Sequence, residues 1–148
     1  MIEGFSEGAN LVIAVARVQA RRLQHNAVGT EHLLLGLCSD ADPTIAEVLR
    51  SAGATYQTVL SRVQSLDGFH DAIPGGILHG YLPFTPRCRQ ALANAVEERL
   101  RRERVLVDAS ALLLGLIQQE DSRGSRILVA LGVDLANLRA TVLDLPHS

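Results

Sequence analysis

Apolar residues near the start of the chain recur at the three- and four-residue spacing of a helix with one buried face. They lie between Glu7 and Leu23 and are Ala9, Val12, Ile13, Ala16, Ala20 and Leu23. A second segment, Thr30 to Cys38, contains the run Leu33-Leu34-Leu35-Gly36-Leu37 and is apolar on most faces. A helix of this kind belongs in a protein interior. The pattern therefore predicts a surface helix followed by a buried one.

The residues between these two helices predict a tight turn and a helix start. Gly29 permits the turn, Thr30 is a suitable N-cap, and Glu31 places a negative charge beside the first-turn amides. Glu31 and His32 thus form an ionisable pair at the start of the buried helix. This pair is the first candidate for a functional site. A purely structural role, as a first-turn acid and a packed histidine, is the alternative.

Two shorter helices are expected next. One covers residues 43–53, with Asp42 or Thr44 as its cap and Gly53 as a natural left-handed C-terminal residue. The other covers residues 55–66, where apolar residues again keep helical spacing. The first part of the chain is therefore a unit of four helices.

The same unit occurs a second time, 79 residues further along. This offset carries Phe5-Ser6 onto Phe84-Thr85 (84 − 5 = 79) and the leucine-rich run onto Leu112-Leu113-Leu114-Gly115-Leu116 without a gap. It also carries Ala16, Gly36, Gly53 and Val63 onto Ala95, Gly115, Gly132 and Val142. The second copy predicts helices over residues 86–104, 108–118, 122–131 and 134–145.

The duplication fixes the expected organisation. The copies occupy residues 1–66 and 84–148, and a linker rich in glycine and proline, residues 67–83, joins them. Each copy is too small for a comfortable core, so we expect the two to pack together through their first helices. The fold class is all-α: tandem duplicated four-helix repeats, eight helices in total, with pseudo-two-fold symmetry.

Composition excludes several classes of function. The net charge of −2 does not favour a nucleic-acid or membrane-surface protein, and no apolar run reaches membrane-spanning length. All 14 basic residues are arginines, which leaves no lysine nucleophile or phosphate-loop lysine. Cys38 and Cys88 are flanked by apolar or helical residues, so a reducing cytoplasm is the expected location. The run from Glu97 to Arg104 mixes charges at helical spacing and predicts a solvated, ion-paired face.

No arrangement of residues predicts catalysis, a metal or a cofactor. His25, His32 and Cys38 match no zinc signature, and no Gly-x-x-x-x-Gly-Lys-Ser/Thr motif is present. An enzyme that uses Glu31 and His32, for example a hydrolase, remains as an alternative without a nucleophile or metal motif to support it. We expect no catalytic residue, no bound metal and no cofactor.

The Phe-Ser/Thr opening, the motif His25-Asn26-x-x-Gly29-Thr30-Glu31-His32 and the gapless duplication together resemble the Clp N-terminal repeat domain. The resemblance covers essentially the whole chain and is greatest to the N domain of ClpC-type unfoldases. It implies a double four-helix repeat that receives substrates and adaptors rather than doing chemistry. It also implies binding of phosphoarginine on tagged substrates, in one pocket per repeat.

Carried onto this sequence, the resemblance implies a first pocket made of Ser6, the Glu7 and Gly8 amides, and Glu31. The chemistry is reasonable, because helix N-terminal amides and a hydroxyl suit a phosphoryl group and a carboxylate suits a guanidinium.

The second pocket departs from the pattern. Thr85, Pro86 and Arg87 are in place, but Ser110 stands where the first copy has Glu31 (31 + 79 = 110). We expect this second pocket to be weakened or lost.

A groove between the copies is a second expected binding surface. Packing of the first helices should bring Asn10 and Ile13 near Arg89 and Leu92, with Ile2 and Phe84 at the helix starts. The resemblance implies cyclic-peptide natural products as ligands of such a groove. The alternative is that Phe84 is a hydrophobic staple beneath its own helix.

The expected partners are tagged protein substrates or adaptors, cyclic peptides and a Clp ATPase, with no nucleic acid or membrane, and the chain is expected to be a monomer. Two settings remain open: an N domain of a larger ATPase, or a stand-alone decoy or regulator that sequesters the same ligands. The divergent second repeat favours the stand-alone form.

Overall fold

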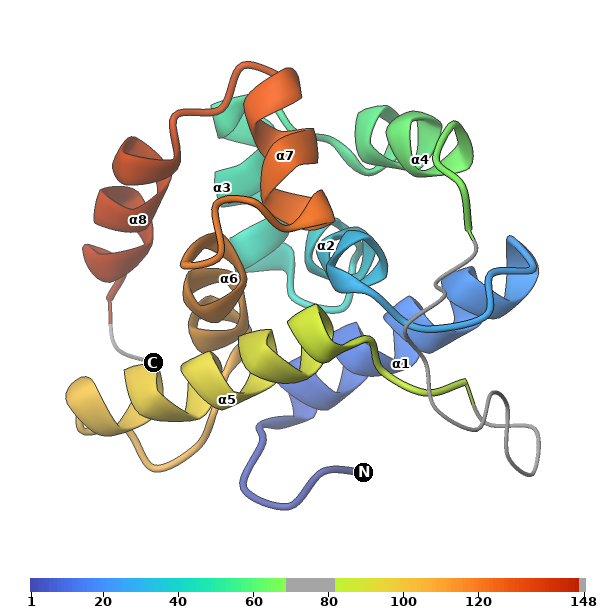
Figure 1. Cartoon of the computed structure of the whole chain (residues 1–148). Helices are drawn as coiled ribbons and strands as arrows, with labels where there is room; N and C mark the ends of the chain where they lie inside the picture. The colour runs from blue at the N-terminus through green and yellow to red at the C-terminus, as the bar shows by residue number, and fades with distance from the viewer. Residues whose placement is uncertain (69–81, 147–148) are drawn as a thin grey trace.

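The computed structural model describes residues 1–68 and 82–146, and within them the chain forms eight α-helices and no β-strand (Figure 1). The helices are α1 (Glu7–Arg22), α2 (Thr30–Cys38), α3 (Pro43–Ala52), α4 (Tyr56–Gln64), α5 (Pro86–Arg101), α6 (Ala109–Ile117), α7 (Arg123–Ala130) and α8 (Leu135–Leu143). The all-α fold is therefore confirmed. Most of the predicted linker, residues 69–81, lies outside the described residues.

The helix bounds repeat at the offset found in the sequence. Adding 79 to the bounds of α1, α2 and α4 gives those of α5, α6 and α8 without a shift (7 + 79 = 86, 30 + 79 = 109, 56 + 79 = 135). The helix α7 starts and ends one residue inside the range projected from α3 (43 + 79 = 122, 52 + 79 = 131). The two copies therefore fold in the same way, helix by helix.

Helix starts follow the expected chemistry with one exception. Asp42, rather than Thr44, caps α3, since its carboxylate accepts a hydrogen bond from the Ile45 amide at 3.0 Å. Thr30 is the first helical residue of α2 instead of its N-cap, and Gly29 takes the cap position. The Thr30 hydroxyl is used elsewhere, because it accepts a hydrogen bond from the amide of Gly124 in the other copy.

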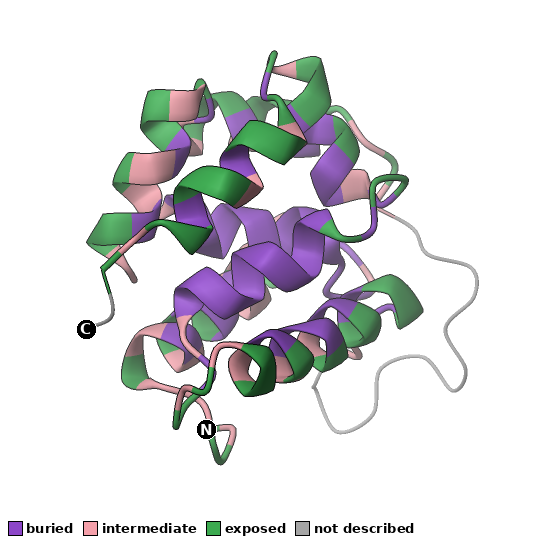
Figure 2. Ribbon diagram, turned by 90° about the vertical axis from the view of Figure 1, so that its left-hand side faces the viewer, coloured by how far each residue is buried: buried purple, intermediate pink, exposed green. Residues whose placement is uncertain are grey.

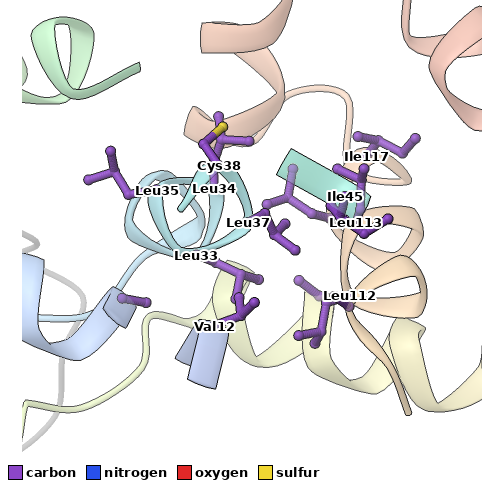
Figure 3. Packing of buried hydrophobic residues seen from close by; sticks show 14 of the residues in the cluster. Val12, Leu33, Leu34, Leu35, Leu37, Cys38, Ile45, Leu112, Leu113 and Ile117 are labelled. Atoms are coloured by element: carbon purple, nitrogen blue, oxygen red, sulfur yellow. The ribbon is translucent and has the colours of Figure 1, made fainter. Parts of the chain in front are cut away.

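The second helix of each copy forms the centre of the molecule. Every residue of α2 and of α6 is buried, and these two helices stand out as uninterrupted buried elements in Figure 2. In Figure 3, Leu33 and Leu37 of α2 face a shared core that includes Val12 of α1 and Leu112 of α6. One hydrophobic core therefore spans both copies.

The copies do not pack mainly through their first helices, as we had expected. In the described part of the chain, α2 packs against α5, α6 and α7, and further contacts join α1 to α6, α3 to α8 and α4 to α7. The pair α1 and α5 is not among the closely packed helix pairs there. A helix that is apolar on all faces can contact both copies at once, whereas α1 has only one buried face.

Two short extended segments also cross between the copies. The Ser6 amide donates to the Val107 carbonyl at 2.8 Å, and the Thr85 amide donates to the Val28 carbonyl at 2.9 Å. The two contacts join equivalent residues, because Thr85 is the counterpart of Ser6 (6 + 79 = 85) and Val107 is the counterpart of Val28 (28 + 79 = 107). Exchanging the two copies therefore exchanges the two contacts. A two-fold relation has this property. As a result, α1 starts beside the segment that leads into α6, and α5 starts beside the segment that leads into α2.

Candidate functional site

The carboxylate of Glu31 holds a guanidinium from the other copy. Glu31 lies in the first turn of α2 and is only 1% exposed. Its Oε2 accepts a hydrogen bond from Nη1 of Arg123, the first residue of α7, at 2.9 Å. The same nitrogen donates to the main-chain carbonyl of Asp67, just beyond α4, at 2.9 Å. The start of α2 is therefore a carboxylate–guanidinium site built from both copies.

Two glycines allow this close arrangement. A Cβ atom on Gly29 would lie 1.9 Å from Oε1 of Glu31, so only glycine leaves room for the carboxylate to turn back over the helix start. A Cβ atom on Gly124 would lie 2.9 Å from the carbonyl oxygen of Thr30, and the Gly124 amide donates to the Thr30 hydroxyl at 3.0 Å. These contacts bring the first turns of α2 and α7 together.

The histidines next to Glu31 have structural contacts. His32 is fully buried, and its Nδ1 accepts a hydrogen bond from the Gly29 amide at 2.9 Å. Its proton therefore lies on Nε2, which is 2.8 Å from Nδ1 of His25. Both ring nitrogens of His32 are thus engaged, which does not suit a general base. No group of three metal-ligating side chains occurs within residues 1–68 and 82–146.

The second copy has an open cavity at the corresponding place. Thr44 and Ser110 are the counterparts of Arg123 and Glu31 (44 + 79 = 123, 31 + 79 = 110), and both line a cavity of about 270 Å³. Its other lining residues are Asp42, Ile45, Arg104, Asp108, Leu145 and Pro146. The two short hydroxyl side chains leave open the space that an ion pair occupies in the first copy.

A cluster of charged side chains, Arg102, Arg104 and Asp108, surrounds Ser110. Its hydroxyl accepts hydrogen bonds from Nη1 of Arg102 at 2.9 Å and Nη1 of Arg104 at 3.2 Å, and donates to Oδ1 of Asp108 at 2.6 Å. Burial opposes ionisation of Asp108, but hydrogen bonds from Ser110, the Ala111 amide and Arg104 outweigh it and lower its pKa. Burial and the charge of Arg104 lower the pKa of Arg102. The counterpart of the Glu31 site thus has a hydroxyl at position 110, surrounded by Arg102, Arg104 and the Asp108 carboxylate.

The structure does not bring Ser6, Glu7 and Gly8 together with Glu31. The Ser6 hydroxyl caps α1 and accepts from the Ala9 amide at 3.1 Å, while Gly8 faces Asp42. The 16 residues of α1 extend over about 24 Å, and the first turn of α2 lies by the C-terminal end of α1, because His32 contacts His25 there. The expected first pocket therefore falls at two opposite ends of one helix.

The helix start that approaches Glu31 belongs to α5. The Thr85 hydroxyl caps α5 by accepting from the Cys88 amide at 3.1 Å. Burial raises the pKa of Cys88 to about 12, and the negative charge of Glu31 adds to the shift. Thr85 lies on the Glu31 side of the molecule, because its amide donates to the carbonyl of Val28, three residues before Glu31, at 2.9 Å. Arg87, two residues on, forms hydrogen bonds with Gln119 and Asp121. Ser110 is not brought to Thr85, Pro86 or Arg87 by any contact within the described residues.

Sequence reasoning missed Arg123. A signal was present, because a cation in the first turn of a helix is opposed by the helix dipole and the other copy has Thr44 there. A basic residue in the first turn of a helix therefore indicates an acidic side chain nearby that stabilises its charge.

The expected groove is formed only in part. Ile2, Asn10 and Ile13 line a cavity of about 620 Å³ together with Met1, Glu7, Leu11, Ala14 and Arg17. The Asn10 side chain fixes the chain start, since its Oδ1 accepts from the Ile2 amide at 2.7 Å. Phe84 instead lies under the Arg17 guanidinium, which is 4.4 Å from its ring centroid. Arg89 and Leu92 are not among the residues that line the cavity.

One prediction about charge needs correction. Glu98 does not lie on a solvated face, since it is fully buried. Its Oε1 accepts hydrogen bonds from Arg101 at 2.9 Å, Gln118 at 2.9 Å and Arg139 at 3.1 Å. The side chain of Glu98 faces α6 and α8, and the charge pattern of the sequence does not reveal this orientation.

The chain is similar to known proteins over almost its whole length. The family model described as the Clp repeat (R) N-terminal domain matches residues 4–131 and 83–146. The chain is 38% identical over 143 residues to the ATP-dependent Clp protease ATP-binding subunit ClpA homolog of Cyanidium caldarium. It is 36% identical to the chloroplastic chaperone protein ClpC2 of Oryza sativa subsp. japonica. Each match covers 97% of this chain but only 16% and 15% of the relative.

Solved structures show the same fold. The N-terminal domain of the chaperone ClpD from Arabidopsis thaliana aligns with a TM-score of 0.80 at 24% identity, covering 97% of this chain and 95% of that one. The Hsp104 N-terminal domain from Candida albicans aligns with a TM-score of 0.76 at 14% identity, covering 96% and 91%. Among the described residues, no helix has the length and apolar character needed to cross a membrane. By sequence and by fold, this chain belongs to the Clp repeat N-terminal domain family.

Proposed function

We propose that this chain is a non-catalytic module that receives protein substrates or adaptors of a Clp-type ATPase and binds phosphoarginine-tagged or peptide ligands. Family membership supports the binding role, and the relatives of which it spans about one sixth are named as ATP-binding subunits and chaperones. A decoy that sequesters the same ligands would use the same surfaces. A cytoplasmic location and a monomeric state stay predictions.

The observation that carries the phosphoarginine proposal is the contact between Arg123 and Glu31. A carboxylate that is 1% exposed already accepts a guanidinium at 2.9 Å. Charge-assisted contacts of this kind are among the stronger hydrogen bonds in proteins. Glu31 therefore has the chemistry and the surroundings to hold the guanidinium of a ligand.

The pocket that we propose lies where α2, α5 and α7 meet. Thr85 at the start of α5, rather than Ser6, is the hydroxyl on the Glu31 side, because the two copies cross at this point. In the other copy Ser110 supplies no carboxylate, and the nearby carboxylate of Asp108 is already engaged by Arg104, Ser110 and the Ala111 amide. We therefore expect one dominant site per chain.

Calorimetry with a peptide that contains one phosphoarginine, beside the same peptide with arginine, tests the proposal. We expect one site for the modified peptide and a loss of about 1.5–3 kcal/mol, roughly 10- to 100-fold in affinity, for Glu31→Ala. Glu47→Ala, at an exposed acid of α3, is the matched control and should bind as the wild type does. Two equal sites, or wild-type affinity in Glu31→Ala, would contradict the proposal.

A second ligand surface is supported by the 620 Å³ cavity along α1. Its walls include the apolar residues Ile2, Leu11, Ile13 and Ala14 and the polar side chains of Glu7, Asn10 and Arg17. Clefts of this size, apolar with a few polar groups, suit peptide anchors. We propose it as the place for a hydrophobic peptide or cyclic peptide.

A further inference from the structure

Arg123 occupies the place where a ligand guanidinium would bind. It is the first residue of α7, where the helix dipole opposes a positive charge. Its position is maintained by Oε2 of Glu31 and the carbonyl of Asp67, each 2.9 Å from Nη1. A ligand that binds Glu31 through a guanidinium must therefore exchange with Arg123.

The second copy shows how much space is left when the Arg123 and Glu31 side chains are replaced by shorter ones. There Thr44 and Ser110 replace Arg123 and Glu31, and a cavity of about 270 Å³ is present. In the first copy the Arg123 side chain is 35% exposed, whereas that of Glu31 is 1% exposed. Arg123 is thus the partner that can turn toward solvent, while Glu31 stays in place.

The charges decide which ligand completes the exchange. A buried carboxylate without a counter-charge is strongly disfavoured, so Arg123 leaves Glu31 only when another cation replaces it. A plain arginine supplies that cation but leaves Arg123 without the carboxylate. A phosphoarginine also brings an anionic phosphoryl group beside its guanidinium, and this group offers Arg123 a new charge-assisted partner.

We propose that Arg123 is the specificity-determining residue of the pocket: it passes from Glu31 to the phosphoryl group as phosphoarginine binds. The pocket selects phosphoarginine over arginine because only the modified ligand preserves two ion pairs. This inference rests on the proposed function of the Glu31 site. It adds a role for a residue of the second copy in a pocket of the first.

The test compares free phosphoarginine and free arginine by calorimetry on the full chain. The variants are Arg123→Ala, Arg123→Lys and the control Arg126→Ala, an exposed arginine on the same helix. In Arg123→Ala we expect the ratio of the two affinities to fall at least 10-fold and arginine to bind more tightly. Arg123→Lys should keep part of the preference, and Arg126→Ala should keep all of it.

The outcomes separate the inference from the proposed function. An unchanged affinity ratio in a folded Arg123→Ala overturns the inference and leaves phosphoarginine binding at Glu31 intact. If wild type binds neither ligand while Arg123→Ala binds both equally, Arg123 only blocks the site and the inference is again overturned. No phosphoarginine binding by any variant removes the proposed function itself. If Arg123→Ala fails to fold, Arg123→Gln takes its place, because glutamine fills the site without a charge; an unchanged preference for phosphoarginine in folded Arg123→Gln overturns the inference.

Discussion

Gly36 of α2 lies directly against the backbone of Val12 in α1: a Cβ atom at Gly36 would be 2.2 Å from the Val12 carbonyl oxygen. Gly115 meets the carbonyl of Ala91 in the same way, at 2.4 Å, in the second copy. Glycine costs a helix interior about 1 kcal/mol relative to alanine. The glycine within each leucine-rich run is thus explained by close helix packing.

We predict that Gly36→Ala lowers the free energy of unfolding by about 1–3 kcal/mol, despite the better helix propensity of alanine, because two backbones must separate. Urea denaturation followed by circular dichroism measures the change. Gly8→Ala is the control, since the nearest atom to its new methyl group would be the flexible Asp42 carboxylate at 3.3 Å and the nearest backbone atom would be 3.8 Å away. Equal stability of Gly36→Ala and wild type would contradict the packing argument.

The two thiols should be unreactive in the folded protein. Burial raises the pKa of Cys38 and of Cys88 to about 12, from 9.0. At pH 8 we expect slow alkylation by iodoacetamide in buffer and fast alkylation in guanidinium chloride, as followed by mass spectrometry. Because the unfolded thiols ionise first, stability should decline as the pH rises from about 9 toward 12. Rapid native labelling of Cys88 would be inconsistent with its burial.

Asp108→Asn should remove a pH-dependent contribution to stability. The pKa of Asp108 is lowered in the folded state, so its contribution is present above pH 3.8 and is lost as the pH falls through the folded-state value. We expect a loss of about 1 kcal/mol at pH 7 that shrinks below pH 4. Asp134→Asn serves as the control, at an exposed cap that accepts from the Asn137 amide. A difference that is constant from pH 7 to pH 3 would refute the assignment.

Glu98→Gln should destabilise the second copy by about 1–3 kcal/mol, since it removes the charge that three donors share. The loss should stay below that of a fully buried ion pair, because Arg101 and Arg139 are 58% and 36% exposed and can be hydrated. The exposed neighbour substitution Glu97→Gln should change stability by less than about 0.5 kcal/mol. Thermal melting measures the stability of both variants. Equal melting temperatures for Glu98→Gln and Glu97→Gln would contradict the role given to Glu98.

Titration with a hydrophobic cyclic peptide should shift the amide signals of Leu11 and Ile13, which line the 620 Å³ cavity. Arg89 and Leu92, which do not line it, should shift less. Movement confined to residues of α8 would show that the peptide binds elsewhere.

The helices and the duplication could be predicted because both are local properties of the sequence. Helix bounds follow from apolar spacing and caps, and the offset of 79 follows from identical runs such as Leu33–Leu37 and Leu112–Leu116. The composition of the pocket could not be predicted in this way. A self-alignment shows that Ser6 corresponds to Thr85, but not which of the two lies near Glu31, because that depends on how the copies cross.

Arg123 was missed for the same physical reason. It reaches Glu31 across 92 residues of sequence, so its unfavourable place at a helix start indicates a partner but not which residue that partner is. The inward turn of Glu98 was missed because its neighbours Glu97 and Arg101 are exposed, so the charge pattern of the segment looked uniform.

The crossed segments at Phe5 and Phe84 have a consequence for the origin of the molecule. Because each pairs with the other copy, a single copy expressed alone would lack the partner for the segment before its first helix. Two such fragments could supply it to each other through the same exchanged contacts, as a homodimer with a two-fold axis. The tandem gene would then be the fusion of an ancestral dimer, and fusion would have freed the two halves to diverge. The difference between Glu31 and Ser110, which are equivalent positions of the two copies, is the kind of divergence that such a fusion would permit.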